Sequence, residues 1–191
     1  MVIGLLAILS ASAAAGMRVA LPLLIIGLLQ GDLWSQVPVL SQVNPRLLIV
    51  ILTSWSLFEL LASKRLLGQR ILQLIQLVFT PLVGALMALT VVKLAHIEMQ
   101  PLWIAAVLGA VFSLVLKLVQ VGWFFRLRGI PPWVALLEDL LCIVLVFLAF
   151  NAPKNGGIIA MLLLWLAVRS STAWRQWYLQ SRVASQDNSR G

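Results

Sequence analysis

The sequence predicts an all-α protein, a polytopic transmembrane bundle of about six membrane helices with both termini in the cytoplasm. The first observation is composition: 62% of the 191 residues are hydrophobic and 10% are charged, with a mean hydropathy of +1.03. A soluble domain is nearer half apolar and a quarter charged, so this chain has too little polar surface for water. The second is that the apolar residues form long continuous runs, which favours helices over the alternating strands of a barrel. The third is that basic residues gather at the ends of alternate runs.

Each predicted helix corresponds to one apolar run, and a run needs about 20 residues to cross a bilayer. By this measure the second and the sixth runs are short. The third follows an amphipathic lead-in, "GQRILQLIQL", and the sixth extends through an amphipathic end toward Tyr178. The fifth begins at "RGIPPW", where two prolines give an extended entry and then a helix start. The six runs cover residues 2–29, 47–62, 77–94, 101–125, 132–150 and 157–168.

The connections between the runs differ in basic charge. Nine basic residues would lie on one face of the membrane and three on the other. The positive-inside rule places the more basic face, and with it both termini, in the cytoplasm. We assign residues 1–180 to one integral membrane domain and residues 181–191, "SRVASQDNSRG", to a disordered polar cytoplasmic tail. The nine are Lys64, Arg65, Arg70, Arg126, Arg128, Arg169, Arg175, Arg182 and Arg190, and the three are Arg46, Lys93 and Lys154.

The first run contains a stretch, "LSASAAAGMRVALPLL", that resembles a leader cleavage site. A leader normally has a basic segment at its start, and here no Lys or Arg precedes Arg18. The apolar run also resumes directly after Arg18. We therefore expect a retained membrane helix, in which the small residues 10–16 let neighbouring backbones approach closely.

Five ionisable residues fall inside the apolar runs, where a charge costs roughly 2.5–3.5 kcal/mol on insertion scales. Such groups usually face the bundle interior and find partners, and the predicted depths place all five in its cytoplasmic half. In one interpretation they pair and fix which helices are neighbours. In the other they line a polar site that binds an ion, a proton or a small charged solute. The five are Arg18, Glu59, Lys117, Glu138 and Asp139.

The sequence offers few residues suited to catalysis or to cofactor binding, and we expect neither an enzyme nor a cofactor. His96, the one histidine, has only Glu98 near it, and two ligands are too few for a metal. The one cysteine, Cys142, is expected to be a small buried side chain. Trp55 and Trp165 are expected to serve in packing. Because the basic residues are scattered at run ends, the charge of +8 indicates lipid contacts rather than nucleic acid.

Prolines and glycines fall inside two of the runs, Pro22 and Gly27 in the first and Pro81 and Gly84 in the third. Breaks of this kind free backbone carbonyl and amide groups, which transporters use for ion and substrate sites. We therefore expect interrupted helices in these two runs.

Four stretches, "AAAGMRVALPLL", "LFELLASK", "FTPLVGALMAL" and "GIPPWVALLEDLLCIVLVFLAF", occur in the order seen in a bacterial integral-membrane family. The chain resembles this family, domain of unknown function 4126 (DUF4126), over most of residues 10–152. It departs from the pattern at Ser63, where the family has an Asp. The resemblance implies that the first helix belongs to the mature domain, and it implies no activity. The matching positions are Gly16, Arg18, Pro22, Glu59, Lys64, Pro81, Gly84, Glu138 and Asp139.

Together these features predict a small ion or solute permease of the inner or plasma membrane, or of a thylakoid membrane for a cyanobacterial source. The five charged residues would form its polar centre. The alternative is a non-transporting scaffold or assembly subunit of a membrane complex. The expected partners are membrane lipids and either further copies of the chain or other membrane proteins.

Overall fold

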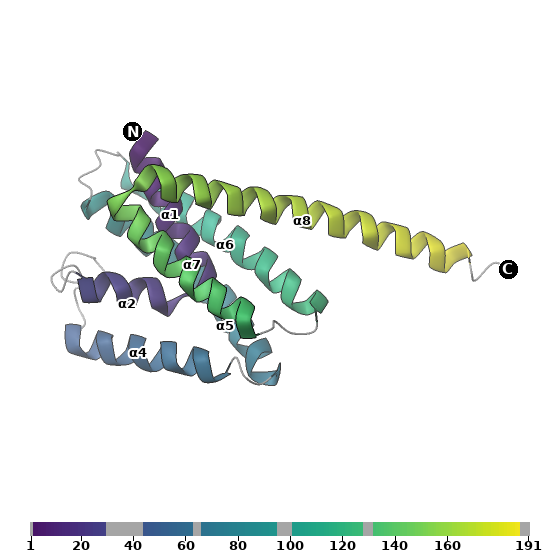
Figure 1. Cartoon of the computed structure of the whole chain (residues 1–191), viewed down its shortest axis with the longest axis horizontal. Coiled ribbons are helices and arrows are strands. Elements are labelled where there is room, and N and C mark those ends of the chain that lie inside the picture. The colour runs from purple at the N-terminus through teal and green to yellow at the C-terminus, as the bar shows by residue number, and fades with distance from the viewer. Residues whose placement is uncertain (1, 30–43, 63–65, 95–100, 128–131, 188–191) are drawn as a thin grey trace.

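A computed structural model describes residues 2–29, 44–62, 66–94, 101–127 and 132–187. Over these ranges the chain is all-α, as the sequence predicts, and no strand is present. Figure 1 shows the helices in chain order. They are α1 (Val2–Met17), α2 (Ala20–Leu29), α4 (Pro45–Ala62), α5 (Leu66–Leu94), α6 (Leu102–Leu127), α7 (Pro132–Asn151) and α8 (Pro153–Asp187).

Three helices within the described ranges are long and apolar enough to cross a membrane. Most of the residues in the spans of α6 and α7 are not buried inside the protein, and large apolar side chains such as Val111 and Leu136 are exposed. An apolar outer surface of this kind is what lipid covers. The count of six crossings and the orientation of the termini stay predictions. The three spans are Ile71–Leu94, Leu102–Trp123 and Trp133–Asn151, and α1 is a shorter apolar helix.

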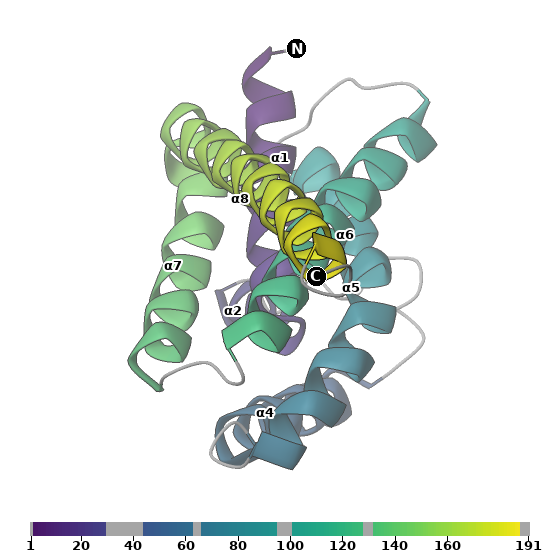
Figure 2. The ribbon, with the colours of Figure 1, turned by 90° about the vertical axis from the view of Figure 1, so that its right-hand side faces the viewer.

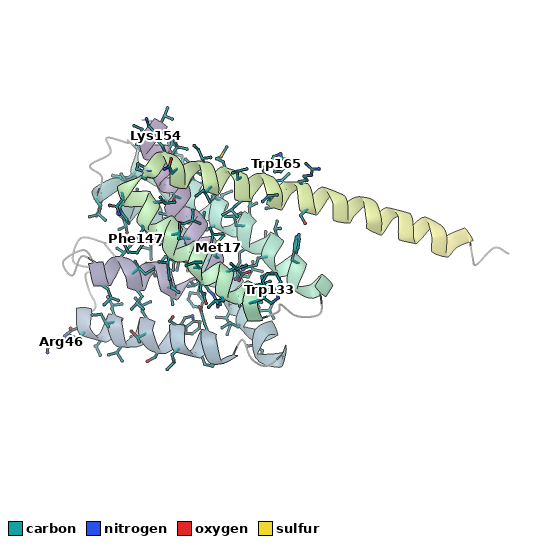
Figure 3. The ribbon with its side chains drawn as sticks, in the orientation of Figure 1. Met17, Arg46, Trp133, Phe147, Lys154 and Trp165 are labelled. Atoms are coloured by element: carbon teal, nitrogen blue, oxygen red, sulfur yellow. The ribbon has the colours of Figure 1, made fainter. Side chains whose placement is uncertain are left out.

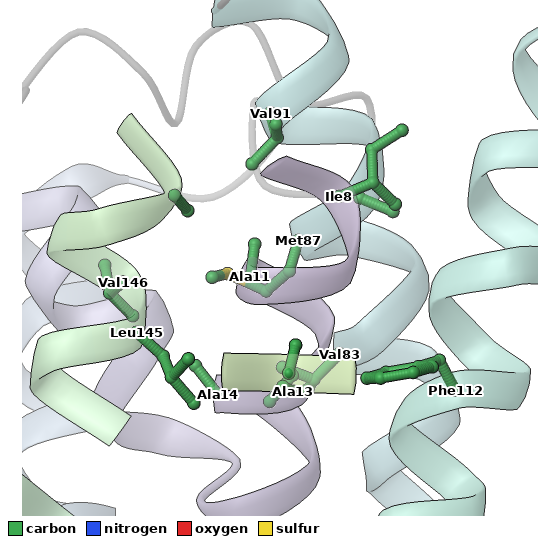
Figure 4. Close-up of a cluster of buried hydrophobic side chains, with 14 of the residues drawn as sticks. Ile8, Ala11, Ala13, Ala14, Val83, Met87, Val91, Phe112, Leu145 and Val146 are labelled. Carbon is green, nitrogen blue, oxygen red and sulfur yellow. The ribbon is translucent and has the colours of Figure 1, made fainter. Parts of the chain in front are cut away.

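The centre of the bundle is α1, which contacts α5, α6, α7 and α8. Figure 2 shows α1 between α7 on one side and α5 and α6 on the other. Residues 10–16 of α1 are all buried. In Figure 4, Ala11 and Ala14 lie among Met87, Leu145 and Val146. The small side chains therefore allow several helices to approach one short helix closely.

The first apolar run is not one helix. It is divided at residues 18–19, where α1 ends and α2 begins in a new direction (Figure 1). Pro22 has no amide hydrogen for the Arg18 carbonyl, and its ring clashes with a helical carbonyl four residues earlier. The interruption predicted from Pro22 thus falls at Arg18 itself, and α2 turns away to pack on α4.

Pro81 and Gly84, in contrast, do not interrupt their helix, and the prediction of a break there was wrong. The helix α5 runs without a break from Leu66 to Leu94 and includes the amphipathic lead-in. Hydroxyl groups bond carbonyls beside the proline: Thr80 Oγ1 donates to the Gln76 carbonyl (2.6 Å), and Ser113 Oγ of α6 to the Thr80 carbonyl (3.2 Å). The helix therefore continues through Pro81, as membrane helices that contain proline can do.

The last helix, α8, begins at Pro153, packs on α1 near its start, and continues to Asp187. In Figure 1 its far end projects away from the other helices. The helix thus enters the segment 181–191 for which the sequence predicts a disordered tail, and residues 188–191 lie outside the described part of the chain.

Candidate intramembrane polar site

The break between α1 and α2 places Arg18 in the interior, where the residue is 6% exposed. Its Nη1 lies 3.7 Å from Glu59 Oε2 on α4, and its Nε lies 2.6 Å from Asp139 Oδ1 on α7. The Nε–H group does not point at this oxygen well enough for a hydrogen bond, so the contact is a close ion pair. One guanidinium group therefore joins two helices to the point where the first run breaks.

Glu59 is more deeply buried, at 2% exposed, and both of its carboxylate oxygens have partners. Oε2 faces Arg18, while Oε1 accepts a hydrogen bond from Trp55 Nε1 (2.8 Å) and another from Gln76 Nε2 (2.8 Å). Trp55 lies one turn earlier on the same helix, and Gln76 lies on α5. A cation and two N–H donors together stabilise a carboxylate that is buried away from water.

Lys117 of α6, 1% exposed, connects to this group through an amide. Its Nζ donates to Gln76 Oε1 (2.5 Å) and to Gln120 Oε1 (3.0 Å). Among the residues that the structure describes, Lys117 makes no direct ion pair with a carboxylate, whereas the sequence predicts such a pair as one alternative. Gln76 therefore carries the link between Glu59 and Lys117.

Glu138 on α7 lies at the other end of this chain of contacts, with its side chain near that of Gln120. It also lines a cavity of about 440 Å³ between α1, α6, α7 and α8. Figure 3 shows two further lining residues, Met17 at the end of α1 and Trp133 at the start of α7. The polar contacts thus extend from Asp139 to the wall of a cavity.

The structure brings all five predicted residues into one chain of contacts, which we call the polar network. It contains three carboxylates and two cations, so it carries one excess negative charge when all are ionised. No group of three His, Cys, Asp or Glu side chains converges as a metal site within the described ranges. The polar network consists of Arg18, Trp55, Glu59, Gln76, Lys117, Gln120, Glu138 and Asp139.

Sequence reasoning missed three members of this network, Trp55, Gln76 and Gln120. One pattern could have identified two of them, because Trp55 precedes Glu59 by four residues and Gln120 follows Lys117 by three. Residues at these separations are neighbours on a helix. Gln76 has no such relation to a charged residue. It was one of several glutamines in the amphipathic lead-in before the third run.

Three further predictions concern single residues. Cys142 is fully buried, with its Sγ 3.5 Å from the Ala14 carbonyl. Trp165 is 53% exposed, with the Arg169 guanidinium 5.0 Å from its ring centre. His96 and Glu98 lie outside the described residues.

The helices, the exposed apolar surface and the buried charges together indicate the class, an all-helical integral membrane protein. The particular family follows from the sequence. The family model of DUF4126, a domain of unknown function, matches residues 5–173. The chain belongs to this family, as its motifs predict. No curated protein and no solved structure matches it.

Proposed function

We propose that the protein is a small multi-pass permease for cations, with the polar network as its binding centre. The observation that supports this most directly is the place of Arg18, in a helix break inside the bundle and paired with carboxylates from two other helices. Charged side chains within membrane helices are costly and usually mark ion or substrate pathways. Interrupted helices at such sites are a recurrent feature of transporters.

The sign of the transported charge follows from the balance of the network. Its three carboxylates outnumber its two cations, so a further cation would complete the charge pairing, whereas an anion would add to the excess. In this proposal the protein lies in the inner or plasma membrane, with six crossings and cytoplasmic termini. It has no enzymatic activity and needs no cofactor, and it functions surrounded by lipid, alone or with further copies of the chain.

A charge-movement measurement tests the permease. The purified protein is reconstituted in liposomes on a solid-supported membrane, and the current is recorded after concentration jumps of protons, Na⁺, K⁺, choline and tetramethylammonium. We expect a protein-dependent transient current with at least one cation, lost in Glu59→Gln and in Glu138→Gln. Glu98→Gln makes the same chemical change in the connection between α5 and α6 and should keep the current. Absence of current with every cation would overturn the proposal.

A non-transporting scaffold is the second candidate, and the ion pairs of Arg18 favour it specifically. They join α4 and α7 to the break between α1 and α2, and such contacts can serve only to set helix neighbours. For a scaffold, Glu59→Gln should lower the yield of monodisperse protein, and no variant should affect a current, since none would exist. The same set of variants therefore separates the two candidates.

A further inference from the structure

The cavity beside Glu138 has a size and shape suited to a small molecule. At about 440 Å³ it falls within the usual range for ligand sites. Its floor is made by buried residues, Gly16, Leu116 and Ala167. Its rim is exposed, with Trp123 at 50% and Trp133 at 63%. The cavity therefore opens to the outer surface of the bundle, the surface that lipid covers.

The chemistry of the walls is apolar apart from three residues, Gln120, Glu138 and Ser170, among the lining residues that the structure describes. Ser170 Oγ is already bonded by Trp123 Nε1 (2.5 Å), which also holds the indole ring in place. The carbonyl oxygen of Gln120 is bonded by Lys117. The one charged group among the described lining residues is the carboxylate of Glu138, in a largely apolar site.

A carboxylate and two indole rings around an apolar volume select one kind of ligand. The aromatic faces attract a cation, and the attraction strengthens when water is excluded. A small hydrated metal ion would lose its water without gaining enough oxygen ligands. An anion would be repelled by Glu138, and a neutral acyl chain would bring the carboxylate no counter-ion. A cation whose charge is surrounded by apolar groups can pair with the carboxylate and pack against both the indole rings and the apolar side chains.

We propose that this cavity binds a hydrophobic organic monocation, a bulky ammonium or phosphonium ion, with Glu138 as its counter-ion and Trp123 and Trp133 against its apolar groups. The ligand enters from the lipid through the exposed rim. This inference rests on the proposed cation permease and names its substrate class. Because Gln120 lines the cavity together with Glu138 and accepts a hydrogen bond from Lys117, a cation at Glu138 lies beside the polar network.

A pair of probes with matched shape and opposite charge provides the test. Radiolabelled tetraphenylphosphonium and tetraphenylborate are each equilibrated with the purified full-length protein in detergent, and the binding that excess unlabelled probe displaces is measured. We expect saturable binding of the cation at one site per chain and none of the anion. Glu138→Gln should weaken the affinity for the cation at least tenfold, and Glu98→Gln should leave it unchanged.

Trp133→Ala is a second variant, which tests the site even if Glu138→Gln fails to fold. The Trp133 side chain is largely exposed, so its loss leaves the core intact. It should weaken binding of the cation several-fold while the protein elutes normally on size exclusion. Equal binding of both probes, or cation binding that ignores both variants, would overturn the inference. So would a co-purified lipid that occupies the site in native mass spectrometry whether residue 138 is Glu or Gln.

The outcome separates this inference from the permease itself. Saturable cation binding without any current in liposomes leaves the cavity assignment standing and removes the permease. A current that needs Glu59 and Glu138, without binding of tetraphenylphosphonium, supports the permease and refutes the hydrophobic-cation site.

Discussion

The crossing of α5 and α6 leaves no room for a single added methyl group at Gly84. A Cβ atom built on Gly84 would meet the hydroxyl of Ser113 and would lie 2.6 Å from the carbonyl oxygen of Gly109. The serine hydroxyl can rotate away, but the backbone carbonyl cannot. Ordinary contact begins at 3.4 Å, so Gly84→Ala must part the two backbones by roughly 0.8 Å. Overpacking of this kind costs about 1–3 kcal/mol. In a chain of this size, we expect the unfolding temperature to fall by about 4–8 °C for a cost near 2 kcal/mol.

The chain contains its own reporter for this experiment. Cys142 is its one cysteine and is fully buried, so a maleimide dye that fluoresces on thiol addition labels it only as the protein unfolds. Gly122→Ala is the matched control, because a Cβ there would meet nothing within 4 Å. It should leave the labelling temperature unchanged or raise it slightly, since Ala favours a helix by about 1 kcal/mol relative to Gly. Labelling of Gly84→Ala within 1 °C of the wild type, or an equal decrease for Gly122→Ala, would refute close packing at this crossing.

Two further predictions use the same thiol-labelling assay on the polar network. Arg18→Met leaves the buried Glu59 and the partly buried Asp139 without their cation, so we expect the free energy of unfolding to fall by about 3–5 kcal/mol. Adding Glu59→Gln to that variant should recover part of the loss, and a further decrease would contradict the ion-pair account. Gln76→Leu removes a donor from Glu59 and an acceptor from the Lys117 ammonium, at a cost of about 1–3 kcal/mol. Gln73→Leu is its control on the same helix, because Gln73 Oε1 is buried without a hydrogen-bond partner, and its labelling temperature should stay or rise.

The charged members of the site could be predicted because of the cost of burying charge. An ionisable residue in an apolar run is rare, and it is retained only where a partner or a function compensates. Glu59 and Lys117 are conspicuous for this reason in the sequence alone. Gln76 is not, because a neutral amide in a membrane helix is common and has many roles. Its importance depends on lying between those two residues.

The helices themselves could be predicted to a similar degree. Apolar runs predict α4, α6 and α7 closely, because the length of a run measures how far a helix stays in an apolar environment. The first and third runs were predicted less well. Both contain proline, yet Pro22 accompanies a break and Pro81 does not. Proline alone therefore does not decide whether a helix breaks, since α5 continues through Pro81 where it packs on α6.

The sequence by itself determined that this chain is helical, that it is too apolar for water, and which of its charges must find partners inside. These properties follow from composition and from the length and continuity of the apolar runs, so no tertiary contact is needed to infer them. Only the tertiary structure decided that Arg18 lies in a break, and that Lys117 reaches an amide 41 residues away. It also placed Glu138 beside a cavity. The physical reason is that pairing of buried groups depends on how closely helices cross, and this is set by small residues such as Gly84 on facing helices.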